Sequence, residues 1–84
     1  MVKSLYSPEL GALLEILRAR RQSAGISQHE LAKRLGRSQS YVTKVETGER
    51  KLEVVEYLAW CRALGLPASG LLDEVEAAKS LIKD

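Results

Sequence analysis

Apolar residues recur along the chain at the three- and four-residue spacing of amphipathic helices, and no segment alternates convincingly between apolar and polar positions as a strand does. The clearest stripe joins Leu10, Leu13, Leu14 and Leu17. Glycines fall mostly between the periodic segments, where they interrupt the pattern. The pattern therefore predicts an all-α fold with five helices, at about residues 8–23, 28–35, 39–47, 52–64 and 69–83.

Helix-start signals sharpen these boundaries. Ser7 before a proline is a plausible N-cap for the first helix. Ser27 with Glu30 three residues later has the spacing of a capping box. Ser38 is placed to cap the third helix, and Gly36 offers a left-handed turn position just before it. The second and third helices are thus short, capped and separated by only a few residues.

The turn between these helices carries a motif. Two short helices joined at Gly36 and Arg37, with the small Ala32 where they would cross, have the geometry of a helix-turn-helix. The spacing is Gln-x-x-Leu-Ala-x-x-Leu-Gly from Gln28, then Ser-x-x-x-Val-x-x-Val-Glu-x-Gly from Ser38. This segment resembles the lambda-repressor-like, or Xre-type, helix-turn-helix family of DNA-binding domains. The matching residues are Gln28, Leu31, Ala32, Leu35, Gly36, Ser38, Val42, Val45, Glu46 and Gly48.

The resemblance extends over about residues 10–72, and Arg37 departs from it because members often carry an apolar residue there. It implies a compact bundle of about five helices in which the second and third form the helix-turn-helix. We expect residues 1–84 to form a single domain with its core at about 8–72. The C-terminal helix, at about 69–83, would serve as cover or as a dimer element.

The third helix has two distinct sides. At 100° per residue, Glu46 falls beside the apolar Val42 and Val45, whereas Ser40, Thr43, Lys44 and Thr47 fall opposite them. Hydroxyl groups and a lysine suit hydrogen bonding to base edges and phosphates in a major groove. The alternative is an ordinary solvated helix face. With the motif present, we expect base contacts from Gln39 at the helix start and from Ser40, Thr43 and Lys44.

Phosphate contacts are expected around this helix. The resemblance implies them for Gln28, which opens the second helix, and for Arg50 and Lys51 in the loop after Gly48. Thr47 and Tyr41 are further candidates, Tyr41 because it lies at the boundary between the outer face and the core. Each has a plainer alternative: a polar first-turn residue for Gln28, solubilising charges for Arg50 and Lys51, and core packing for Tyr41.

Two charges stand on apolar faces. Arg21 follows Leu17 by four residues, and Glu46 shares its side of the third helix with Val42. An unpaired buried charge costs several kcal/mol, so each needs a partner. The family resembled pairs an arginine late in the first helix with this glutamate. We expect a structural salt bridge between Arg21 and Glu46; the alternative is that Arg21 extends to solvent.

The fourth helix is apolar around most of its circumference, with only Glu53, Glu56 and Arg62 polar. Such a helix is buried on more than one side, which suggests a subunit interface. The fifth helix has a short heptad-like spacing that suits either cover within the chain or a dimer seam. The candidate dimer-interface residues are Tyr57, Trp60, Leu71, Val75 and Ile82.

Composition removes several classes of protein. The 84 residues contain one cysteine, Cys61, and one histidine, His29, so neither an intrachain disulfide nor a Cys/His zinc site is possible. The chain has no nucleophile–base pair or phosphate-binding glycine loop, so we expect no enzyme activity, metal or cofactor. No apolar run is long enough for a membrane span, and the N-terminus lacks a signal-peptide pattern. We therefore expect a cytoplasmic protein.

The net charge of +2 hides an uneven distribution. Residues 18–51 hold nine Lys and Arg against three Glu, a local +6, whereas residues 52–84 hold three basic and six acidic residues, a local −3. The basic segment contains the helix-turn-helix, as expected for a DNA-binding surface.

These patterns predict a sequence-specific DNA-binding transcriptional regulator. It would act as a small dimeric repressor that binds double-stranded DNA at a palindromic operator and reads the major groove with residues 39–47. The alternative is an antitoxin or another protein-interaction module of the same fold, which would bind a protein partner through its fourth and fifth helices.

Overall fold

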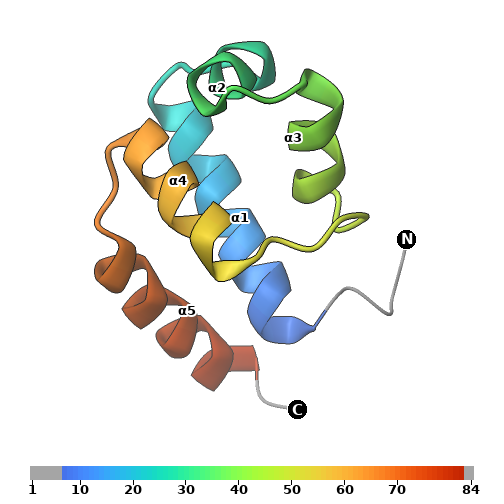
Figure 1. Ribbon diagram of the computed structural model, residues 1–84. Helices are drawn as coiled ribbons and strands as arrows, with labels where there is room; N and C mark the ends of the chain where they lie inside the picture. Colours follow the sequence, from blue (N-terminus) through green and yellow to red (C-terminus); the bar gives the residue numbers. More distant parts are fainter. Residues whose placement is uncertain (1–6, 83–84) are drawn as a thin grey trace.

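A computed structural model describes residues 7–82 of the chain, with only the backbone described for residues 79–82. Within this range the fold is all-α, as predicted (Figure 1). The third helix ends one residue before the predicted Thr47, and the fourth begins after the predicted Leu52 because Glu53 is its N-cap. The helices are α1 (Pro8–Ser23), α2 (Gln28–Leu35), α3 (Gln39–Glu46), α4 (Val54–Leu64) and α5 (Ala68–Ile82).

Local hydrogen bonds set the helix starts. The hydroxyls of Ser7, Ser27 and Ser38 each accept a bond from the backbone N–H three residues later, at 3.0, 3.0 and 3.1 Å. The predicted capping box of α2 is only half formed, because the Glu30 carboxylate accepts a bond from Arg34 instead. The complete capping box lies at the start of α4.

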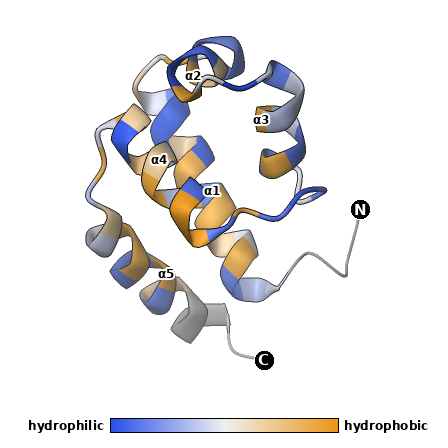
Figure 2. Cartoon of the chain, viewed as in Figure 1, coloured by the Kyte–Doolittle hydropathy of each residue, from blue (hydrophilic) through white to orange (hydrophobic). Residues whose placement is uncertain are grey.

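The helices pack around α1, which runs through the middle of the bundle (Figure 1). α5 lies along α1, while α2 packs against α3 and α4. The hydrophobic sides of α1, α3 and α4 turn inward, whereas the outer side of α2 and the loop after α3 are hydrophilic (Figure 2). The largest fully buried side chains come from all five helices: Trp60, Leu17, Leu31, Leu71, Val42 and Val45.

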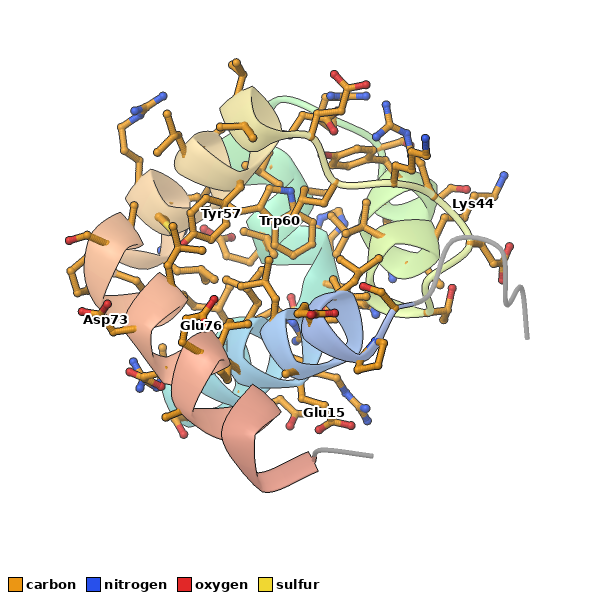
Figure 3. All side chains as sticks on the ribbon, turned by 90° about the horizontal axis from the view of Figure 1, so that it is seen from below. Glu15, Lys44, Tyr57, Trp60, Asp73 and Glu76 are labelled. Carbon is orange, nitrogen blue, oxygen red and sulfur yellow. The ribbon has the colours of Figure 1, made fainter. Side chains whose placement is uncertain are left out.

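The predicted dimer interface is wrong for four of its five residues. Trp60 is 0% exposed, and Tyr57, Leu71 and Val75 are also buried within one chain. Figure 3 shows Tyr57 and Trp60 inside the bundle. The physical reason is that α5 folds back along α1, so the apolar sides of α4 and α5 are used within the chain. The side chain of Ile82 lies outside the described residues.

The apolar side chains that do reach the surface are different ones. Val54 and Val55 at the start of α4 are each 75% exposed, and Leu58 and Leu72 are exposed to a lesser extent. A dimer surface, if it lies on α4, must therefore use the outer side of this helix.

Two negative findings apply to the described part of the chain. No helix among residues 7–82 has the length and apolar character that crossing a membrane requires. The same residues contain no cluster of three or more His, Cys, Asp or Glu side chains that could hold a metal ion.

Candidate nucleic-acid interface

α2 and α3 form the helix-turn-helix. Gly36 ends α2 with a φ of 69°, a left-handed conformation that glycine adopts without strain. Ala32 is buried beneath this turn, and its small side chain permits the close approach of the two helices. Val42 and Val45, on the inner side of α3, are fully buried. Only one side of α3 is therefore left at the surface.

That surface side holds most of the predicted DNA contacts. Gln39, Ser40, Lys44 and Thr47 are exposed, and Thr43 is half-buried. Lys44 lies on the outer edge of the molecule, away from the core (Figure 3). The Thr47 hydroxyl donates a hydrogen bond to the backbone carbonyl of Lys44 at 3.2 Å. The structure thus groups an amide, hydroxyls and an ammonium on one face, as reading of base edges requires.

Arg21 and Glu46 form the ion pair expected from the sequence. Arg21 Nε and Nη2 donate to the two Glu46 carboxylate oxygens at 2.7 and 3.1 Å. Arg21 Nη1 donates to the backbone carbonyl of Ile26 at 2.7 Å. The two side chains are 8% and 4% exposed, so the pair is buried and bidentate. It ties the end of α3 to α1 and to the loop before α2.

Gln28 extends this network through one of its two Nε2 protons and through Oε1, and the predicted phosphate contact stays a prediction. Its Nε2 donates to Glu46 at 2.8 Å, and its Oε1 accepts a bond from the Thr43 hydroxyl at 2.9 Å. The acceptor Glu46 requires the NH₂ end of the amide, so the amide orientation follows from chemistry. Thr43, a predicted base contact, likewise spends its one hydroxyl proton within the protein. The hydrogen bond between Gln28 and Thr43 holds α2 to α3 on one flank of the exposed face.

Tyr41 is also placed differently from the phosphate contact predicted for it. The residue is buried, and its hydroxyl accepts a hydrogen bond from Trp60 Nε1 at 3.1 Å. The two rings meet edge-on with centroids 6.2 Å apart. A buried indole N–H needs an acceptor, and Tyr41 supplies it. The alternative of core packing therefore describes this side chain.

Two arginines cover the ring of Tyr41. Arg37 Cζ lies 3.9 Å and Arg50 Cζ 4.8 Å from the ring centroid, within the range of cation–π contact. Both guanidinium groups also meet the carboxylate of Glu56, Arg37 at 3.5 Å and Arg50 at 3.0 Å. Arg50, one of the predicted phosphate contacts, thus lies at the surface with its guanidinium group held by Tyr41 and Glu56. Lys51, the next residue, is exposed.

Burial and neighbouring hydrogen bonds shift the pKa of Glu56 in opposite directions. Burial raises the pKa of its carboxyl, but hydrogen bonds from the Glu53 backbone N–H and from Arg50 lower it more, so the pKa lies below its usual value. The hydrogen bond to Glu56 raises the pKa of the Arg50 guanidinium. The Glu56 carboxylate and the Arg50 guanidinium are therefore both ionised at neutral pH.

Sequence reasoning missed Arg37 and Glu56 as parts of this surface. Arg37 was seen only as a departure from the family pattern. The one available signal was its spacing of four residues from Tyr41, which places a cation beside an aromatic ring at the start of a helix. Glu56 had no such signal, because its partners come from two separate turns.

The comparisons with known proteins agree with this geometry. A family model described as a helix-turn-helix domain matches residues 9–75. The chain belongs to the Xre-type helix-turn-helix family, whose class is that of DNA-binding transcriptional regulators. No curated protein matches the chain significantly.

Solved structures of similar fold provide points of reference. An XRE-family like protein from Pseudomonas syringae pv. tomato is 45% identical, with a TM-score of 0.81 over 89% of this chain and 92% of that one. The restriction-modification controller protein C.AhdI from Aeromonas hydrophila is 34% identical, with a TM-score of 0.70 over 77% and 98% of the two chains. The clp gene regulator ClgR from C. glutamicum is 27% identical, with a TM-score of 0.74 over 83% and 91%.

Proposed function

We propose that this protein is a sequence-specific repressor that places α3 in the major groove of an operator and acts as a two-fold dimer. The observation that carries the proposal is the single exposed, polar side of α3, on a helix whose other sides are buried. A helix held in this way presents its side chains in one orientation, as direct reading of bases requires.

The exposed residues divide into two roles. Gln39 and Ser40 stand at the N-terminal end of α3, the part of a recognition helix that commonly faces base edges. A glutamine amide can bond adenine N6 and N7 together. Lys44, one turn further on, is exposed and suits either a base edge or a phosphate. Thr43 contributes its outer surface rather than its hydroxyl proton, which Gln28 receives.

Phosphate contacts are proposed for the loop that follows α3. Arg50 and Lys51 lie next to the recognition helix, and Arg50 is already oriented by Glu56. Thr47 is exposed at the end of α3. These residues fix the position of the protein on the duplex without reading its sequence.

The dimer is proposed to form through the outer side of α4. On a helical projection Val54, Val55 and Leu58 fall within one third of a turn of each other, and all three are exposed. This face begins after Glu53 and ends at Arg62, both exposed. An antiparallel contact between two copies of α4 therefore places unlike charges together at both ends of the apolar patch, as a self-complementary interface requires.

Occupancy of an operator by such a dimer is the proposed mechanism of repression. Two α3 helices in successive turns of the groove read half-sites about 34 Å apart. Relatives that are a clp gene regulator and a restriction-modification controller support a regulatory role for this chain.

DNA binding is tested by its salt dependence. If the dimer makes roughly 6–10 phosphate contacts, affinity for a duplex falls about 10³–10⁵-fold between 50 and 200 mM salt. Fluorescence anisotropy with a labelled duplex measures this change. An affinity that is negligible, or unaltered over that range, contradicts the proposal.

A protein partner is the second candidate, and the exposed valines of α4 are the observation that favours it. An antitoxin or interaction module would cover Val54 and Val55 with another protein rather than with a second copy of this chain. The mass of the purified complex distinguishes the two, because a homodimer has twice the mass of one chain.

A further inference from the structure

Arg37 and Arg50, here called the arginine pair, reach one place from opposite ends of α3. Arg37 stands just before Ser38, the N-cap of α3, and Arg50 lies in the loop after this helix. Both guanidinium groups nevertheless meet over the ring of Tyr41 and at the carboxylate of Glu56. Two segments 13 positions apart in the numbering therefore bring two positive charges together.

Tyr41 and Glu56 contact the arginine pair on its inner side, and its outer side is accessible to solvent. Arg37 and Arg50 have side chains 42% and 39% exposed, whereas that of Glu56 is 19% exposed. Glu56 is itself anchored, since its Oε1 accepts the backbone N–H of Glu53 at 3.0 Å. The ring of Tyr41 is fixed in turn by Trp60. Carboxylate and ring thus form a rigid base under the two arginines.

Two guanidinium groups share the carboxylate of Glu56, and Glu53 is a further negative charge near Arg50. Among residues 7–82, Arg37 and Arg50 donate their hydrogen bonds through Nη1 only. The remaining N–H groups of two adjacent forks are available to an anion with several oxygens.

The position of the pair relative to α3 identifies the anion. On the helical projection Tyr41 falls about 60° from Lys44, so it borders the exposed polar face of α3. When α3 lies in a major groove, the DNA backbone runs along this border. The opposite border is occupied by Gln28, whose amide bonds Glu46 and Thr43.

We propose that Arg37 and Arg50 together bind one phosphate of the DNA backbone, with Tyr41 as the platform and Glu56 as the carboxylate that keeps the two guanidinium groups side by side. The inference rests on the proposed function, because it assigns a ligand to the flank of the same DNA-reading face.

The chemistry favours a shared phosphate. Both guanidinium groups already meet the two oxygens of a single carboxylate, so they lie close enough to meet two oxygens of a single phosphate. Planar forks match phosphate oxygens in a way that lysine ammonium groups do not. Because the side chains are ordered before DNA arrives, less conformational entropy is lost on binding.

A purely structural role gives a different expectation. If Arg37 and Arg50 only fasten the loop after α3 to α4, their loss lowers stability and leaves the salt dependence of DNA binding unaltered. If they hold a phosphate, each phosphate contact that is lost lowers the slope of log affinity against log salt by about 0.9.

The test compares Arg37→Gln, Arg50→Gln and the double variant on one labelled duplex from 50 to 200 mM salt. Arg34→Gln is the matched control, because Arg34 is 43% exposed and also paired with a carboxylate, that of Glu30. The Arg34→Gln variant loses one positive charge, as the test variants do, but away from α3. Arg34 lies near the end of α4, where it donates a hydrogen bond to the backbone carbonyl of Ala63. Thermal melts verify that each variant is folded, and Arg37→Lys keeps the charge without the fork if Arg37→Gln fails to fold.

We expect each single variant to bind more weakly than the control and the double variant to lose about 1.8 in slope in total, because one phosphate contact is lost in each of the two protomers. Arg37→Lys should bind more weakly than the unaltered protein. A slope for the double variant equal to that of Arg34→Gln overturns the inference, as does an affinity for Arg37→Lys equal to that of the unaltered protein. A loss of about 3.6 in the double variant overturns the shared phosphate, because it indicates two separate contacts in each protomer. If the unaltered protein binds no duplex, the proposed function itself fails.

Discussion

Arg21 and Glu46 show how single residues orient the recognition helix. Burial removes both charges from water, and only a bidentate contact with further hydrogen bonds offsets that cost. The Ile26 carbonyl and the Gln28 amide provide these additional bonds. The pair therefore links α1, the loop before α2 and the end of α3 at one point.

Removal of one member leaves the other buried without a counter-charge. We expect Glu46→Ala to lower the free energy of unfolding by about 3 kcal/mol. Urea denaturation measures the change, with Glu30→Ala as the control, since the exposed Glu30–Arg34 pair contributes about 0–1 kcal/mol. If Glu46→Ala and Glu30→Ala lower the free energy of unfolding equally, burial of the Arg21–Glu46 pair has no energetic consequence.

Glu56 makes a pH-dependent contribution. Folding lowers its pKa below 4.5, so the ionised carboxylate stabilises the folded state above pH 4.5 and the contribution is lost as pH falls through the lower folded pKa. Glu56→Gln retains a capping side chain without the charge. We expect the unaltered protein to be more stable than this variant at pH 7, and the difference to shrink below about pH 4.5. Stability measured by urea at several pH values is the check, and a difference that grows on acidification has the wrong sign.

At the scale of elements, the proposed function assigns sequence reading to α3 and anchoring to the loop after it. Gln39 faces outward at its start, whereas Arg50 lies in the following loop. We expect Gln39→Ala to relax the preference at one base pair, where discrimination by a bidentate contact is about 1–3 kcal/mol, and Arg50→Gln to weaken binding to all sequences about equally. Affinities for a set of duplexes with single base changes measure both. Identical base preferences before and after Gln39→Ala would remove Gln39 from the reading surface.

The elements themselves were predictable from the sequence because their signals are local. Serine caps and the left-handed Gly36 mark helix ends within three or four residues. The pairing of Arg21 with Glu46 was predictable as well, since two charges on apolar faces require partners. Tyr41 was misplaced because its partner, Trp60, comes from another element. A helical projection gives the side of a helix but not what packs there.

The dimer interface was misjudged for a related reason. The apolar circumference of α4 indicated two buried sides, and the structure shows that α2, α5 and Tyr41 of α3 pack against this helix. Tyr57 and Trp60 look like interface residues by type, yet an 84-residue chain also needs large side chains for its own core.

At the scale of the whole molecule, two copies are expected to meet through Val54, Val55 and Leu58. Val55→Glu places a charge within this apolar contact, so we expect the protein to become monomeric and to lose affinity for a two-half-site duplex. Sedimentation measures the first effect and anisotropy the second.

Leu72→Glu is the matched control for this change, because Leu72 is an exposed apolar residue on α5. It should leave the mass of the complex unaltered. If Leu72→Glu gives monomers and Val55→Glu does not, the interface lies on α5 and the proposed α4 contact is wrong.

The central claim is that two copies of α3 read a symmetric operator, and selection of binding sites from random duplex DNA tests it most directly. We expect enriched sites with two inverted half-sites whose centres are about 34 Å, or one helical turn, apart. We also expect Gln39→Ala to alter one position in each half-site. Sites without symmetry, or no enrichment over the starting pool, would contradict it.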